Sequence, residues 1–83
     1  MLYRFDAEHI SRPTAVSLVR ELEDKDIEVE HADMSPWFAN QMFMIVTCDE
    51  AVGKQICACI WELNNGAYCR MIQCTQQELD SYL

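Results

Sequence analysis

The fold depends on residues 49–66, which read DEAVGKQICACIWELNNG. The apolar side chains recur at the spacing of one face of an amphipathic helix, at Val52, Ile56, Cys59, Ile60 and Leu63. Thr47 and Glu50 stand three residues apart, as in a capping box, and Asn64-Asn65-Gly66 supplies a glycine for the left-handed position that ends many helices. These signals predict a helix over about residues 49–64.

A β-hairpin is the alternative for the same segment. In that interpretation, residues 55–63 form a strand that turns at Asn64-Asn65 into residues 67–74, and the β-branched Ile56 and Ile60 are compatible with it. The helix is favoured because its start, its apolar stripe and its stop agree with one another.

Two strands flank this helix. Residues 42–46, Met-Phe-Met-Ile-Val, are apolar on both faces, which is typical of a strand in the centre of a sheet. Residues 68–74 form the last strand. Thr75-Gln76-Gln77-Glu78 is a second capping box and begins a short terminal helix.

The N-terminal half shows the same alternation of strand and helix. Residues 2–6 alternate as a half-buried strand does, with Tyr3 and Phe5 on one face. Ser11 fits an N-cap and Pro13 the first turn of a helix over about residues 12–24. The apolar stripe of this helix consists of Ala15, Leu18, Val19 and Leu22.

Residues 26–31, Asp-Ile-Glu-Val-Glu-His, alternate strictly and predict a second strand near a sheet edge. The apolar face of that strand carries Ile27, Val29 and His31, and the polar face carries Asp26, Glu28 and Glu30. The connector 34–40 is expected to hold one helical turn that begins at Ser35 and Pro36.

The resulting order, β-α-β-β-α-β and a short helix, predicts one α+β domain over residues 1–83. This order defines the ferredoxin-like split βαβ arrangement, a four-stranded antiparallel sheet with two helices on one face and the other face open. The arrangement serves many unrelated functions, so it predicts no particular activity.

Composition limits the functions that are open to the chain. Six Lys and Arg against 14 Asp and Glu give a formal net charge of −8, which repels phosphate backbones and anionic membranes and predicts a basic protein as partner. Two glycines are too few for a glycine-rich phosphate loop. Five cysteines without an export signal predict reduced thiols and a cytoplasmic location, and no apolar run reaches membrane-spanning length.

Half of the acids lie in one short run between residues 21 and 33. These are Glu21, Glu23, Asp24, Asp26, Glu28, Glu30 and Asp33, with a single lysine among them. On a strand, carboxylates of one face lie about 6.6–6.8 Å apart, close to two phosphate rises of a DNA strand at about 3.4 Å each. The run therefore predicts a partner-binding surface that mimics nucleic acid. The alternative is a solvated edge that discourages strand pairing.

Two aromatic pairs leave a choice between interface and core. Trp37 and Phe38 lie in the connector and are candidate partner-binding residues, because tryptophan is frequent at interface hot spots. The alternative folds both over the edge of the core. Tyr3 and Phe5 suggest a homodimer if they lie on the open face, and belong to the core if the helices cover them.

The sequence predicts no metal site, cofactor or catalytic set. Cys57-Ala58-Cys59 lacks the spacer usual in zinc sites, and on a helix Cys57 lies about 200° from a core-facing Cys59. Most of the cysteines are therefore expected to be small buried apolar residues. His9 and His31 are isolated, and no nucleophile, base and orienting group can be assembled from the spacing.

These features favour a small, non-enzymatic acidic protein that docks on a basic surface of a larger, nucleic-acid-handling protein and inhibits or modulates it. A phage-type counter-defence or transcription-modulating factor has these properties. Two other classes are a homodimeric structural or assembly module that uses the open sheet face and a thiol-based metal-binding or redox protein.

Overall fold

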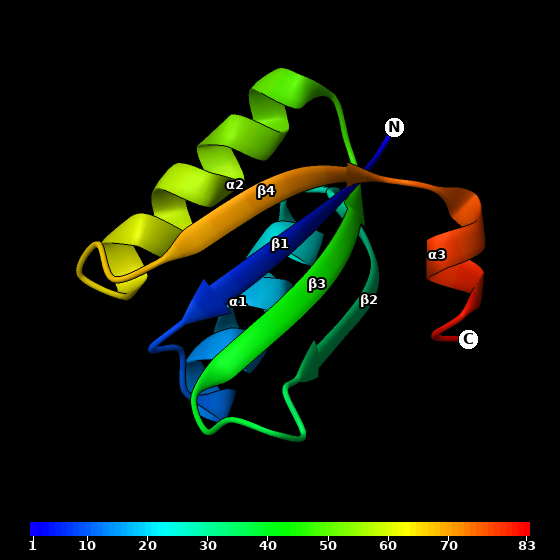
Figure 1. The fold of residues 1–83 in the computed structure, drawn as a ribbon. Coiled ribbons are helices and arrows are strands. Elements are labelled where there is room, and N and C mark those ends of the chain that lie inside the picture. Colours follow the sequence, from blue (N-terminus) through cyan, green and yellow to red (C-terminus); the bar gives the residue numbers. More distant parts are fainter.

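The chain alternates strands and helices in the predicted order. The computed structural model describes all residues from 1 to 83 and contains β1 (Leu2–Glu8), α1 (Arg12–Asp24), β2 (Glu28–Met34), β3 (Gln41–Thr47), α2 (Glu50–Leu63), β4 (Cys69–Cys74) and α3 (Gln76–Asp80). The strands form one antiparallel sheet in the order β2-β3-β1-β4 (Figure 1). This confirms the ferredoxin-like fold, with β3 inside the sheet and β2 at its edge, as predicted.

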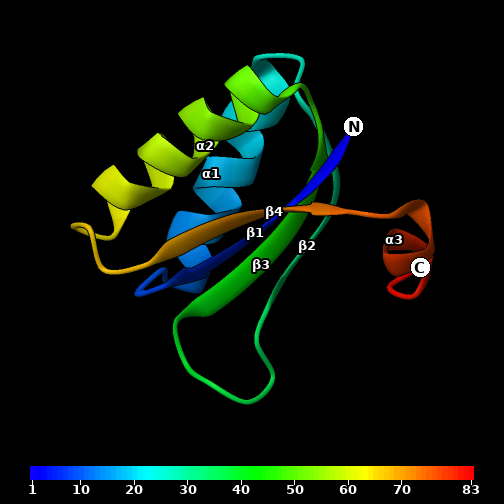
Figure 2. The same ribbon diagram turned by 45° about the horizontal axis from the view of Figure 1, so that its top comes forward.

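The core lies between the sheet and the two long helices. Figure 2 shows α1 and α2 on one side of the sheet and α3 on the other. The buried side chains between α1, α2 and the sheet include Tyr3, Phe5, Ala7, Leu18, Leu22, Met42, Met44, Val46, Ile56 and Ile60. Tyr3 and Phe5 are therefore core residues, since the helices cover the face of β1 on which they lie.

The hairpin alternative for residues 55–63 is wrong, because α2 is helical from Glu50 to Leu63. The predicted Thr47 cap is also wrong: Thr47 still belongs to β3, and the Asp49 carboxylate accepts the Val52 N–H at 2.8 Å. At the other end, Gly66 takes the left-handed conformation with φ 73°. Its N–H donates to the Trp61 carbonyl at 2.7 Å.

Asn64 is a buried polar residue that joins three elements. Its side-chain Nδ2 donates to the backbone carbonyls of Glu8, at 2.9 Å, and Tyr68, at 2.7 Å. These bonds tie the end of α2 to the end of β1 and the start of β4. The sequence indicated only a turn at this position.

A β-bulge changes the faces of β2. Val29 is opposite Val46 and His31 is opposite Ile45, so Glu30 is the extra residue. An extra residue shifts the alternation of all later side chains. The predicted inward position of His31 is therefore wrong: it lies on the face away from α1 and α2, 5.3 Å from the Tyr82 ring centroid.

The terminal helix covers part of the sheet face that was expected to be open. Thr75 caps α3 as predicted, with its hydroxyl accepting the Glu78 N–H at 3.1 Å. Leu79 of α3 packs against Ile45 and Cys74, and the three side chains form a second buried cluster. The α3 helix is thus held by apolar burial on this face.

No helix has the length and apolar character that crossing a membrane requires.

Candidate functional site

The seven carboxylates predicted to bind a partner lie in the last turns of α1, in the turn after it and in β2. Glu21 pairs with Lys25 at 3.4 Å, and the salt bridges of the molecule include none of the other six. Five of these six are exposed, and Glu30 is half-buried. Six carboxylates between the last turns of α1 and the end of β2 are therefore left without a salt bridge. We call Glu23, Asp24, Asp26, Glu28, Glu30 and Asp33 the acidic surface.

The evenly spaced row predicted for three of these residues does not form. Asp26 lies in the turn after α1 with φ 60°, before β2 begins. Glu30 lies in the bulge, where its carboxylate accepts the Thr47 hydroxyl at 2.9 Å. A left-handed residue and a bulge both interrupt the two-residue repeat of a strand. Mimicry of phosphates by a regular row of Asp26, Glu28 and Glu30 is thus excluded.

Trp37 and Phe38 project from the loop between β2 and β3. Their side chains are 85% and 63% exposed, so the alternative in which they fold over the core is wrong. The expected helical turn is also absent, because residues 35–40 contain bends and a turn but no helix. The Ser35 hydroxyl accepts the N–H groups of both aromatic residues at 3.2 Å. The Ser35 N–H donates to the Gln41 carbonyl at 2.8 Å and closes the base of the loop. The loop is held by these bonds while its two largest side chains stay in solvent.

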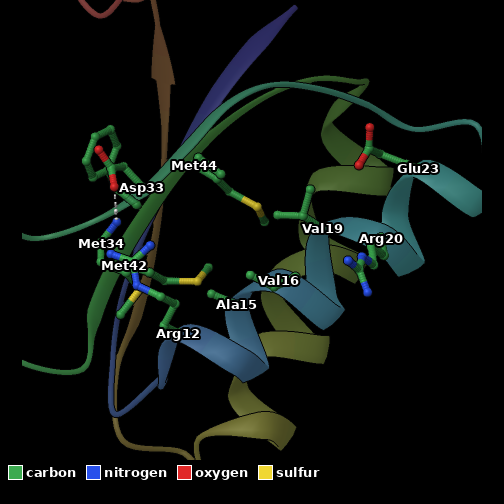
Figure 3. A pocket seen from close by; sticks show the side chains of 12 residues that line it. Arg12, Ala15, Val16, Val19, Arg20, Glu23, Asp33, Met34, Met42 and Met44 are labelled. Carbon is green, nitrogen blue, oxygen red and sulfur yellow. Dashed lines mark hydrogen bonds between the residues drawn. The ribbon is translucent and has the colours of Figure 1, made fainter.

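A groove of about 300 Å³ separates α1 from β2 and β3. In Figure 3, Ala15 and Val19 point from α1 toward Met42 and Met44. Val16 is 44% exposed beside them. Charged side chains at the rim are Arg12, Arg20, Glu23 and Asp33. Sequence reasoning missed this groove, because it assigned the apolar side chains of α1 and β3 to the core without showing that α1 leaves a gap beside the edge strand.

Arg4 organises the sheet face beneath α3. Its Nε donates to Asp6 at 2.9 Å, and its Nη1 donates to Glu78 at 3.0 Å and to the Tyr82 hydroxyl at 2.7 Å. Partial burial by itself lowers the pKa of Arg4, but these hydrogen bonds outweigh it and raise the pKa. The guanidinium lies 4.8 Å from the Phe43 ring centroid, a cation–π distance. Arg4 therefore has a structural role, fastening the C-terminal residues to the sheet.

The cysteines do not gather into a metal site. No group of three or more His, Cys, Asp or Glu side chains is arranged to hold a metal ion. Cys59 lies beside Glu21 and Lys25, at the contact between α2 and α1. Cys57 faces β4 instead, and its Sγ lies 3.2 Å from Cys69 Sγ. The structure thus places the two neighbouring cysteines of α2 in different surroundings.

No family model, curated protein or solved structure matches this chain. The function must therefore be inferred from the surfaces of the molecule itself.

Proposed function

We propose that this protein is a non-enzymatic acidic binding protein that docks on a basic surface of a larger, nucleic-acid-handling protein and inhibits or modulates it. The observation that supports this most is the acidic surface, six carboxylates without a salt bridge, followed by the exposed Trp37. A phage-type counter-defence or transcription-modulating factor in the cytoplasm is the kind of protein we infer.

Charge selects the class of partner. A net charge of −8 attracts basic surfaces and accelerates encounter with them, and repels nucleic acids and anionic lipids. A clustered basic face is the footprint of proteins that bind nucleic acid. An acidic protein bound to that face competes with the phosphate backbone of nucleic acid for the same lysine and arginine side chains.

The edge strand supplies a place for the contact. An edge strand has unpaired backbone N–H and C=O groups, and an extended partner segment can pair with them. In such a pairing, alternate side chains of the partner lie over the apolar groove and over the side of β2 that carries Glu28 and Asp33. We infer that the complementary segment alternates apolar and basic residues.

A second copy of the chain fits this edge poorly. Pairing two β2 strands brings Glu28, Glu30 and Asp33 of both copies together, and like charges opposite one another destabilise a sheet. The homodimer alternative on the other sheet face also loses its expected side chains, since Tyr3 and Phe5 are buried beneath the helices. The exposed Trp37 is better suited as an apolar anchor beside a basic patch.

Affinity capture from the native host, with matched baits, tests this function. Wild-type chain should retain a protein with a basic nucleic-acid-binding surface, release it as salt rises, and reduce its binding to nucleic acid. The Glu28→Gln/Glu30→Gln variant should retain several-fold less, mainly through slower association. Trp37→Ala should also retain less, through faster dissociation.

The control needs the same change in net charge at another place. Glu62→Gln/Asp80→Asn provides it, because Glu62 makes no salt bridge and Asp80 only accepts the exposed Gln76 amide. If Glu28→Gln/Glu30→Gln, which we call the β2 variant, captures as much partner as wild type at low salt, the acidic surface does not bind the partner. A captured protein that binds nucleic acid equally well with and without this chain contradicts the inhibitory function.

A further inference from the structure

Two thiols from different elements meet at the contact between α2 and β4. Cys57 Sγ of α2 and Cys69 Sγ of β4 are 3.2 Å apart, and no covalent bond joins them in this structure. We propose that Cys57 and Cys69 are a redox modification site, at which a peroxide converts the two thiols into a reversible disulfide between α2 and β4. This inference does not depend on the proposed function, because neither residue belongs to the acidic surface.

The fold holds the two sulfur atoms together through a close approach of α2 to β4. Gly53 precedes Cys57 by four residues and so lies on the same face of α2. Met71 follows Cys69 by two residues and lies on the same face of β4. A Cβ atom at Gly53 would stand 2.5 Å from Met71 Cε, the end of a flexible side chain, so α2 and β4 pack closely at this point. The contact between Gly53 and Met71 continues directly into the contact between the two thiols.

The two thiols differ in accessibility. Cys69 is 8% exposed, whereas Cys57 is half-buried. Burial, and then the hydrogen bond with Cys57, raises the pKa of Cys69 above its ordinary value of 9.0. Because Cys57 is the more accessible thiol, it meets the oxidant first, and Cys69 is the resolving thiol.

The oxidation balances with hydrogen peroxide as the oxidant. The Cys57 sulfur attacks one peroxide oxygen, the O–O bond breaks, and sulfenic acid and one water are formed. The Cys69 sulfur then attacks the Cys57 sulfur, the S–OH bond breaks, and the disulfide and a second water are formed. The two thiols lose two electrons and two protons in total, and peroxide is reduced to two waters. A small dithiol reverses the bond by exchange.

The bond would close a short loop that holds the end of α2, the turn at Gly66 and the start of β4. Its two ends are 12 residues apart in sequence. A crosslink over such a loop limits the unfolded chain, and in a domain of this size it should raise Tm by about 10 °C.

Peroxide titration of the purified full chain tests the site. After oxidation, free thiols are blocked with an alkylating reagent and the protein is digested for mass spectrometry. We expect a linked peptide pair containing Cys57 and Cys69, a monomer that has lost two hydrogens, and alkylation of the other three cysteines. Dithiothreitol should restore all five thiols and the original Tm.

Serine variants decide between a specific and an indiscriminate oxidation. Cys57→Ser and Cys69→Ser should each abolish the intramolecular bond, whereas Cys59→Ser, on the same helix, should form it as wild type does. Circular dichroism of each variant checks that it is folded, and trapping of sulfenic acid at Cys57 in folded Cys69→Ser supports the order of the two steps. Intermolecular dimers only, a bond between other cysteines, or further oxidation of Cys57 without a bond to Cys69 would overturn the proposal.

Discussion

The two faces of the sheet are stabilised in different ways. On the face beneath α1 and α2, strand residues such as Phe5, Met44 and Val46 are apolar and fully buried. On the other face, Ile45 is buried beneath Leu79 of α3, and a polar cluster around Arg4 lies next to it. Burial in the first case follows the strand alternation, whereas in the second it depends on the C-terminal helix folding back over β3. The short α3 thus buries a small cluster on part of one face, while two long helices bury the main core on the other.

Truncation of one large apolar residue on each face should have the largest effect. Leu22→Ala, in α1 against the helix-covered face, and Ile45→Ala beneath α3 should each lower the free energy of unfolding by about 2–5 kcal/mol, because both side chains are buried. Denaturant unfolding of the two variants measures this. A cost below about 1 kcal/mol for Ile45→Ala alone would show that α3 does not bury its face as the helices do.

Asn64→Ala, at the end of α2, should lower the free energy of unfolding by about 2 kcal/mol. The change removes the donor to the partly buried carbonyls of Glu8 and Tyr68. Gln77→Ala, at an exposed position of α3, is the control and should change stability by less than about 0.5 kcal/mol. Equal stability of the two variants, measured by urea unfolding, would mean that the Asn64 bonds contribute nothing.

Alkaline pH should lower the free energy of unfolding through a buried thiol on each face of the sheet, and more through Cys69 than through Cys74. Burial raises the pKa of Cys69 and of Cys74 above the ordinary 9.0; at Cys74 the charge of Glu78 raises the pKa further and the charge of Arg4 lowers it. In the unfolded chain these thiols ionise near that value while the folded protein keeps them protonated. Stability is therefore full below about pH 9 and falls as pH rises, by at most about 1.4 kcal/mol per pH unit for each thiol.

Unfolding measured at several alkaline pH values in two variants separates these contributions. Cys69→Ala should flatten the decline more than Cys74→Ala, since burial and the hydrogen bond with Cys57 raise the pKa of Cys69 further than the pKa of Cys74 is raised. Parallel curves for wild type and Cys69→Ala would contradict the assignment.

Removal of carboxylate charges should have the smallest effects on stability. The effect should differ between the acidic surface and the polar cluster around Arg4. Glu28→Gln/Glu30→Gln should leave stability unchanged or raise it by a few tenths of a kcal/mol, because two like charges are removed and glutamine still accepts the Thr47 hydroxyl. Glu78→Gln should instead cost up to about 1 kcal/mol, because it weakens the 3.0 Å ion pair with Arg4. Thermal unfolding of both variants measures the difference, and a loss of stability in the β2 variant would mean that its carboxylates stabilise the fold.

Local patterns were enough to predict most of the architecture. Helix α1 begins and ends as predicted, α2 lies within one residue of its predicted ends, and β3 is the central strand. These elements are specified by side-chain periodicity and by caps such as Ser11, which act between residues close in sequence. The concentration of carboxylates between Glu21 and Asp33 is also a property of the sequence itself.

Tertiary structure alone decided the faces and contacts on which the proposed binding surface and the proposed thiol pair depend. The bulge at Glu30 depends on the register between β2 and β3, and it moved His31 to the other face of the sheet. The meeting of Cys57 with Cys69 depends on how closely α2 approaches β4. The exposure of Trp37 follows from hydrogen bonds to the Ser35 hydroxyl and the absence of an element that covers the loop. Each of these depends on geometry between elements that pair or pack after they form, whereas the periodicity of a single segment reports only which side of that segment is apolar.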